Sequence, residues 1–240
     1  MTTSVTTTNP VRSDVLDAQA RPESRLTSRG WAFAGIGAAV CGAATIATSS
    51  MVDTVYQEKY QTNLDGFAAD LHDKAGVLFA FHSITALGAV LMLVFAAGLH
   101  RRLRAVMADS IVPAVAGAAL AGTAVVSILG SGLDTEFMMG LATNGKVPDS
   151  SAAIYNNWIG TIPWLWTLAG LAGLGLYVAG RRGVVARWVG RVGLVLGGLT
   201  VLLGISPLEY MSGVTGSLWL LATSLGFAFG DRRFRGAFRA

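Results

Sequence analysis

The run AGVLFAFHSITALGAVLMLVFAAGL, residues 75–99, and the segment HRRLRAVMAD that follows it at 100–109 decide the fold class. The first stretch contains no Asp, Glu, Lys or Arg. Roughly 20 apolar residues, rising about 1.5 Å each, cross a hydrocarbon core about 30 Å thick. An uncharged run of this length that ends in an arginine cluster therefore predicts a transmembrane helix.

Five further apolar stretches repeat the pattern. With the first, they predict six spans, near residues 31–52, 75–99, 110–133, 157–180, 188–208 and 210–230. The composition agrees, since hydrophobic residues make up 52% of the 240 and charged residues only 13%, against about a quarter charged in soluble domains. We therefore expect an all-α, polytopic membrane helical bundle over residues 30–230, between a disordered polar tail at 1–29 and a basic tail at 231–240.

The charges of the connecting segments predict the orientation. Arginines gather after the second, fourth and sixth spans, whereas the segments 53–74 and 134–156 carry mostly acids. The positive-inside rule then places the arginine loops and both termini in the cytoplasm. The pI of about 9.6 reflects arginines beside the spans rather than a basic face, so we expect the lipid bilayer as partner and no nucleic acid.

The residues favour no cofactor and no metal. Cys41 is the single cysteine, so neither a disulfide nor a thiolate metal site is available. The three histidines, His72, His82 and His100, all belong to the second span or its ends. Ligands to a haem or zinc ion usually face one another from separate helices, and this arrangement does not provide that.

The predicted spans contain no Asp, Glu, Lys or Arg except Arg191, which can reach the interface. Proton relays and ion-coupled carriers use ionisable groups at depth, so this pattern disfavours a transporter. His82 is the one intramembrane histidine and a candidate ligand-binding residue. The alternative for His82 is a hydrogen bond to a neighbouring helix.

The segment GSGLDTEF, residues 130–137, places two acids at the end of the third span. We expect Asp134, Glu136, His72 and Asp73 to form a catalytic group, in which either Asp134 or Glu136 is the proton donor and His72 with Asp73, from the outer end of the second span, is a supporting pair. A carboxylic acid packed against aromatic rings resists ionisation and can donate a proton near neutral pH. The candidate ligand-binding residues at this end are His82, Phe137, Trp158, Trp164, Trp166, Glu209 and Tyr210. The competing interpretation is that these acids are solvated loop charges that set topology.

Small residues and prolines predict how the helices pack. The pairs Gly193 with Gly197 and Gly226 with Gly230 have small-xxx-small spacing, which we interpret as packing within the bundle. Pro163 is expected in the first turns of the fourth span, and Pro207 in a tight turn that makes spans five and six antiparallel neighbours. The residues indicate no oligomeric state.

The chain resembles a known set of proteins in layout. The Thr- and Ser-rich tail, the segment LHDKAGVLFAFHSI at 71–84, the following HRRLR and the acid pair after span three resemble the uncharacterised actinobacterial membrane proteins of domain of unknown function nine-nine-eight. This resemblance implies a six-helix bundle in a bacterial plasma membrane and no established activity. The architecture is also similar to small integral-membrane terpene cyclases, in which an acid protonates an alkene or epoxide and aromatic faces stabilise the cation. Those enzymes usually have seven spans.

Three functions remain open at this point. The first is a site for a lipophilic ligand at the outer end, with acid-catalysed cyclisation or isomerisation of a terpenoid-like substrate. The second is a non-catalytic accessory bundle that binds a partner through its glycine-rich faces. The third is a small-solute permease.

Overall fold

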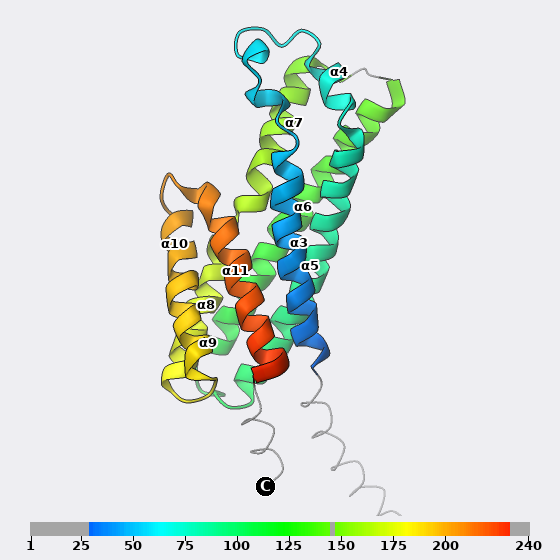
Figure 1. Cartoon of the computed structure of the whole chain (residues 1–240). Coiled ribbons are helices and arrows are strands. Elements are labelled where there is room, and N and C mark those ends of the chain that lie inside the picture. The colour runs from blue at the N-terminus through cyan, green and yellow to red at the C-terminus, as the bar shows by residue number, and fades with distance from the viewer. Residues whose placement is uncertain (1–28, 145–146, 231–240) are drawn as a thin grey trace, which may run out of the picture.

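The computed structural model describes residues 29–144 and 147–230, which form helices joined by short turns (Figure 1). No strand occurs within these two ranges. The predicted tails at 1–29 and 231–240, apart from Arg29, lie outside them. Six helices in the described part are long and apolar enough to span a membrane: Gly30–Ser50, Ala75–Arg104, Val112–Gly140, Asp149–Arg181, Arg187–Gly204 and Glu209–Gly230. The all-α class and the six spans are thus confirmed.

Three of these spans are single helices, and three are made of shorter segments. The single helices are α3 (Gly30–Ser50), α5 (Ala75–Arg104) and α6 (Val112–Asn144). The fourth span consists of α7 (Asp149–Thr161), the 3-10 turn η3 (Ile162–Trp164) and α8 (Thr167–Arg181). The fifth span consists of α9 (Arg187–Val192), the π-helical η4 (Gly193–Gly197) and α10 (Gly198–Gly204). The sixth consists of η5 (Glu209–Met211), α11 (Ser212–Leu225) and the π-helical η6 (Gly226–Gly230).

The spans form a closed ring in chain order. Each packs against the spans before and after it, from α3 through α5, α6, α8 and α10 to α11, and α11 returns to α3 (Figure 1). A chain that crosses back and forth with short turns makes neighbours in sequence neighbours in space. The interior is filled by small residues and by a few large buried side chains, among them Phe95, Leu120 and Trp219.

Glycines bring the fourth and fifth spans into backbone contact. A methyl group on Gly173 would lie 2.8 Å from the Cα of Gly197, and one on Gly193 would lie 2.3 Å from the carbonyl oxygen of Gly173. A methyl group on Gly226 would lie 2.8 Å from the ring of Trp188. Gly193, Gly197 and Gly226 are therefore packed inside this chain, as the sequence indicated, whereas Gly230 is exposed.

Several predicted span ends differ from the structure. The second span continues to Arg104, the third continues past 133 through Asp134, and the fourth begins at Asp149 rather than at 157. The predictions ended each span at the first charged or polar residue, but Arg, Asp and Glu are tolerated in a helix once it has begun. A helix that leaves the hydrocarbon core stops only where its backbone or packing requires.

The fourth span is broken in its middle. Pro163 lies in η3 between α7 and α8, not in the first turns as predicted, and Leu165 leaves the helical conformation. The Trp164 carbonyl, freed by the break, accepts a hydrogen bond from the Ser212 hydroxyl of α11. Breaks of this kind are tolerated in membrane helices where neighbours satisfy the freed backbone groups.

A folded cap covers one end of the bundle. It consists of residues 51–74 and α7, and includes η1 (Thr54–Tyr56), η2 (Glu58–Tyr60) and α4 (Phe67–His72). The cap and the start of α5 share an apolar core separate from that of the bundle, whose fully buried members are Phe67, Leu71, Leu78, Phe81, Ala152, Tyr155 and Ile159. The segment 53–74, which the sequence described only as an acidic loop, is thus an ordered layer over the bundle.

Two polar side chains of α7 fix the cap. The Asn156 amide donates to the Val52 carbonyl oxygen at 3.0 Å, and its oxygen accepts from the Val55 N–H at 3.3 Å. Asp149 accepts from the Ala68 N–H at 2.7 Å and from the Gly66 N–H at 3.3 Å, at the start of α4. These contacts satisfy three backbone N–H donors and one carbonyl acceptor of the cap.

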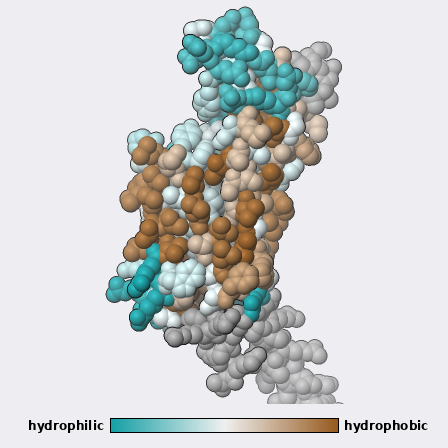
Figure 2. Space-filling model, viewed as in Figure 1, coloured by the Kyte–Doolittle hydropathy of each residue, from teal (hydrophilic) through white to brown (hydrophobic). Residues whose placement is uncertain are grey.

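The opposite end carries the arginines and both ends of the described chain. Figure 2 shows a hydrophobic band over the helices, with hydrophilic residues above it on the cap and below it at the arginine end. Arg29, at the start of α3, donates to the Ala228 carbonyl oxygen at 3.1 Å. The first and last described residues therefore lie on the same side of the bundle, and we call this side the arginine end.

Candidate functional site

Asp134 is the strongest candidate for a functional group. It lies within α6 and has no exposed surface, so it is neither a loop residue nor a solvated boundary charge. The prediction that the six spans contain no acid is therefore wrong, because the third span extends to Gly140. An ionisable residue inside a membrane span is expensive and is by default a candidate for function.

Close contacts with α5 and α7 surround the α6 turn just before Asp134. His82 on α5 is 2.9 Å from the Ser131 carbonyl oxygen and 2.8 Å from its hydroxyl, and Trp158 on α7 donates to the Gly130 carbonyl oxygen at 3.4 Å. Gly130 permits this approach, because a methyl group there would lie 2.4 Å from Ile162. Three helices thus meet where Asp134 begins the next turn.

Both oxygens of the Asp134 carboxyl are buried and lack a hydrogen-bond partner among the described residues. The hydroxyl of Tyr155 on α7 is also buried and has no partner within the same residues. Phe137, one helical turn after Asp134 on α6, stacks on the Tyr155 ring, so both groups belong to the contact between α6 and α7. Buried polar groups are nearly always paired, so these unpaired groups make the contact a candidate site.

Aromatic rings pack around Tyr155. Phe137, three residues after Asp134 on α6, stacks on the Tyr155 ring with centroids 4.5 Å apart and planes 7° from parallel. The same apolar cluster contains Phe81 and, at its edge, Trp158. The Asp134 carboxyl therefore lies one helical turn from an aromatic cluster.

The His82 ring is oriented by α6. A carbonyl oxygen only accepts, so the Nδ1 bonded to the Ser131 carbonyl carries the proton, while the Ser131 hydroxyl donates to the His82 carbonyl oxygen at 3.3 Å. This is the helix-to-helix contact that the sequence offered as the alternative to ligand binding. The Nε2 atom makes no hydrogen bond to any residue that the structure describes.

The remaining predicted site residues do not join Asp134. His72 and Asp73 are exposed at the end of α4, and their side chains make no hydrogen bond or ion pair within the described residues. The Trp164 ring packs edge to face on the Tyr210 ring, with centroids 6.3 Å apart, and Tyr210 lies in η5 together with Glu209. Glu136 lies in α6, but its side chain is outside the part that the structure describes.

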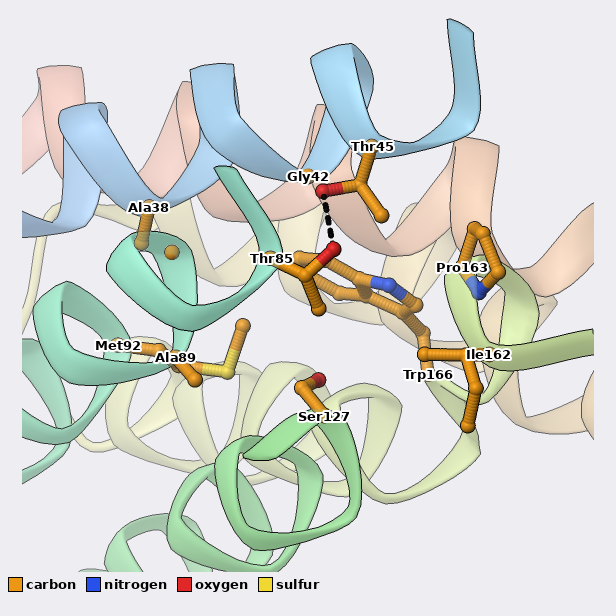
Figure 3. A pocket seen from close by; sticks show the side chains of 11 residues that line it. Ala38, Gly42, Thr45, Thr85, Ala89, Met92, Ser127, Ile162, Pro163 and Trp166 are labelled. Atoms are coloured by element: carbon orange, nitrogen blue, oxygen red, sulfur yellow. Dashed lines mark hydrogen bonds between the residues drawn. The ribbon is translucent and has the colours of Figure 1, made fainter. Parts of the chain in front are cut away.

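Trp166 lies in the bundle, beside a small cavity. The cavity has a volume of about 20 Å³ and includes Thr45, Thr85, Met92, Ser127 and Trp166 in its lining (Figure 3). Figure 3 also shows the hydroxyls of Thr45 and Thr85 bonded to each other, at 3.2 Å. A cavity of this size holds about one water molecule. It is too small for a substrate, and Trp166 serves here as a packed core residue.

Tyr155 is the site residue that the sequence analysis missed. The predicted fourth span began at 157, so Tyr155 fell in a loop and was left out of the site. The signal was present: Asp149 follows Pro148 at a typical helix start, and Tyr155 and Trp158 share one face at a spacing of three.

Comparisons with known proteins add no family to this geometry. No protein-family model matches the chain, and neither a curated protein nor a solved structure matches it. Among the described residues, no group of three or more His, Cys, Asp or Glu side chains is placed to hold a metal ion.

Proposed function

We propose that this chain is a multi-pass membrane enzyme that uses Asp134 to protonate a lipophilic, terpenoid-like substrate, followed by isomerisation or cyclisation. The observation that carries the proposal is the fully buried Asp134 carboxyl with two unpartnered oxygens, together with the unpartnered Tyr155 hydroxyl on the neighbouring helix α7. General acids in enzymes act from such water-excluded positions. Aromatic walls favour an apolar substrate over a hydrated one.

The reaction needs no co-reactant. The Asp134 O–H bond breaks as its proton adds to a carbon–carbon double bond, which leaves a carbocation on the substrate and a carboxylate on the enzyme. The faces of Phe137, Tyr155 and Trp158 stabilise the cation through their negative π surfaces. The carboxylate then removes a proton from a carbon next to the cation, which forms a new double bond and restores the acid. The product is an isomer of the substrate, either rearranged or closed into a ring.

Tyr155 and His82 have supporting roles in this proposal. The Tyr155 hydroxyl is a neutral donor that can stabilise the Asp134 carboxylate after proton transfer. His82, held by Ser131, keeps α5 and α6 in register one turn before the acid. His72 and Asp73, which are exposed on α4, have no part in the chemistry.

We also propose an orientation. The arginine end faces the cytoplasm, both termini lie there, and the cap faces the outside of a bacterial plasma membrane. The arginines at the ends of α5, α8 and α9 support this orientation through the positive-inside rule. Cysteine labelling in intact cells tests it: Gln61→Cys on the cap is expected to react with an impermeant maleimide, and Arg182→Cys only after lysis.

The activity is tested by comparing small molecules in membrane extracts. Cells that produce the wild-type chain, Asp134→Asn and Asp73→Asn are extracted and compared by mass spectrometry. Asn keeps the size of Asp134 but cannot donate the proton, while Asp73 is an exposed acid of the same cap. An isomer that appears with the wild type and with Asp73→Asn, and is absent with Asp134→Asn at equal membrane yield, supports the proposal.

A further inference from the structure

A second polar feature lies at the arginine end, far from Asp134. It is a groove of about 380 Å³ between α8 and α9, lined by Tyr177, Gly180, Arg181, Arg187, Gly190 and Arg191. Its volume is in the range of sites for small molecules, about 300–1,000 Å³. No step of the proposed reaction uses it.

The turn between the two helices builds the groove. Gly183 has φ +71°, its N–H bonds to the Gly180 carbonyl oxygen, and the N–H of Val184 bonds to the Ala179 carbonyl oxygen. This is the Schellman arrangement, in which a left-handed residue ends a helix and reverses the chain. Beyond the turn, a methyl group on Gly180 would lie 3.0 Å from the Cα of Gly190. The backbones therefore touch, and arginines from both helices border one groove.

The groove is positively charged and has no internal counterion. Arg181, Arg187 and Arg191 are exposed and form no ion pair with any residue in 29–144 or 147–230. Residues 150–208 contain no Asp or Glu, so the helices that form the groove supply no acid. Arg187 and Arg191 are four apart on one helix and present two guanidinium groups on the same face. Guanidinium groups bind phosphate oxygens in paired hydrogen bonds.

The surroundings of the groove indicate a lipid rather than a soluble anion. Above Arg191 on the same span, Val195 and Leu202 are 62% and 63% exposed, and Figure 2 shows that the hydrophilic arginine end adjoins the hydrophobic band. A phosphate held by the arginines thus lies where lipid headgroups lie, with apolar helix surface beside it. Basic pockets between membrane helices commonly hold the headgroups of anionic lipids.

We propose that this groove binds the phosphate group of an anionic phospholipid. Arg187 and Arg191 hold the phosphate oxygens from α9, and Arg181 closes the groove from α8, where its Nη1 donates to the Tyr177 hydroxyl at 3.3 Å. The acyl chains lie along the exposed apolar surface of the fifth span. The glycine contact between Gly180 and Gly190 sets the spacing of the arginines.

Binding is measured on the full chain in mixed detergent micelles. The midpoint of thermal unfolding is followed against the mole fraction of dioleoyl-phosphatidylglycerol, and separately against dioleoyl-phosphatidylcholine and inorganic phosphate. We expect phosphatidylglycerol to raise the midpoint with saturation, phosphatidylcholine to have no saturable effect, and phosphate to act at least tenfold more weakly. Inorganic phosphate that saturates at an equal or lower concentration would overturn the lipid assignment.

Matched variants separate the groove from general electrostatics. R187Q/R191Q removes two charges from the groove, and R104Q/R182Q removes two exposed charges from the same end outside it. The half-saturating phosphatidylglycerol fraction is expected to rise at least tenfold in the first and less than threefold in the second. Equal shifts in both would refute a defined site. R187K/R191K keeps the charge, and if R187Q/R191Q does not fold, binding by the lysine variant as tight as wild type refutes the guanidinium role.

Discussion

Phe137 and Tyr155 stack face to face across α6 and α7, with ring centroids 4.5 Å apart. The stack lies one helical turn from Asp134, and the Asp134 carboxyl and the Tyr155 hydroxyl are both buried without a hydrogen-bond partner among the described residues. A carboxyl group without a hydrogen-bond partner is rarely buried in a protein. Here the cap covers Asp134, which is the central residue of the proposed site.

Replacing the buried acid is expected to stabilise the fold while removing activity. Asp134→Leu removes two unpartnered oxygens from an apolar site and is expected to raise the free energy of unfolding by about 1–3 kcal/mol. Thermal unfolding in detergent measures the change, and Asp73→Leu on the exposed end of α4 is the control. A destabilised Asp134→Leu variant would show that the carboxyl has a structural partner.

The aromatic stack is expected to couple Phe137 and Tyr155 energetically. A double-mutant cycle with Phe137→Leu and Tyr155→Leu should give a coupling energy of about 0.5–1.5 kcal/mol, since stacked rings contribute beyond their buried area. Chemical unfolding in mixed micelles supplies the four values. Additive effects would mean that the two rings pack independently.

The cap should depend on Asp149. Asp149→Ala removes the acceptor for two N–H groups at the start of α4 and is expected to cost about 1 kcal/mol. Limited proteolysis should then cut residues 53–74 faster than in the wild type, whereas Asp73→Ala should not change the rate. Equal cleavage in both variants would argue against the capping role.

Acid is expected to loosen the cap. Hydrogen bonds with Lys59 and Lys74 lower the pKa of Asp70 and of Asp53 below the ordinary 3.8. A carboxyl whose folded pKa is depressed stabilises the fold above its unfolded pKa, and this contribution disappears as the pH falls through the folded value. Both pairs are solvent-exposed, so the effect is small and screened by salt.

Hydrogen exchange tests this pH dependence. Amides in 53–74 should lose protection as the pH falls below 3.8, the ordinary carboxyl pKa, after correction for intrinsic rates, while those of α8 should not. Lys59→Met with Lys74→Met should remove this pH dependence. Loss of protection in α8 at the same pH would indicate global unfolding instead.

Glycines at the contact between spans four and five, which we call the glycine seam, should differ in their tolerance of a methyl group. Gly173→Ala places a methyl group 2.8 Å from the Gly197 Cα, whereas Gly198→Ala places one 3.7 Å from Leu174, an ordinary contact. The first variant is expected to destabilise the bundle, and the second to stabilise it by about 0.5–1 kcal/mol through helix propensity. Thermal unfolding of both variants compares them, and equal midpoints would contradict backbone contact at the seam.

The six spans could be predicted because their signal is local. Each is a run of apolar residues whose length matches the membrane, and this property survives any packing. The places of Asp134 and Tyr155 in the structure could not be predicted from such a local pattern. A charge predicts the end of a hydrophobic run but not the end of a helix, so Asp134 was placed just outside a span that continues through it.

The cap shows the same limit more strongly. Residues 53–74 have the charges of a loop, and they fold because two distant residues supply hydrogen bonds. Asn156 is 101 residues from its partner Val55, and Asp149 is 81 residues from its partner Ala68. Periodicity in the segment itself does not report those partners. The pairing of Trp164 with Tyr210 and the burial of Trp166 likewise depend on the break at Pro163. The predicted site residues therefore lie in three separate places: in the cap, beside the break in the fourth span, and near Asp134.

Acid catalysis by Asp134 is tested by the small-molecule content of membranes that carry the wild type, Asp134→Asn or Asp73→Asn. We expect an isomer, with the same elemental composition as a lipophilic precursor, that is present with the wild type and Asp73→Asn and at least a hundredfold lower with Asp134→Asn. An isomer of undiminished abundance in Asp134→Asn membranes, or no wild-type-dependent isomer at all, would contradict an acid-catalysed role.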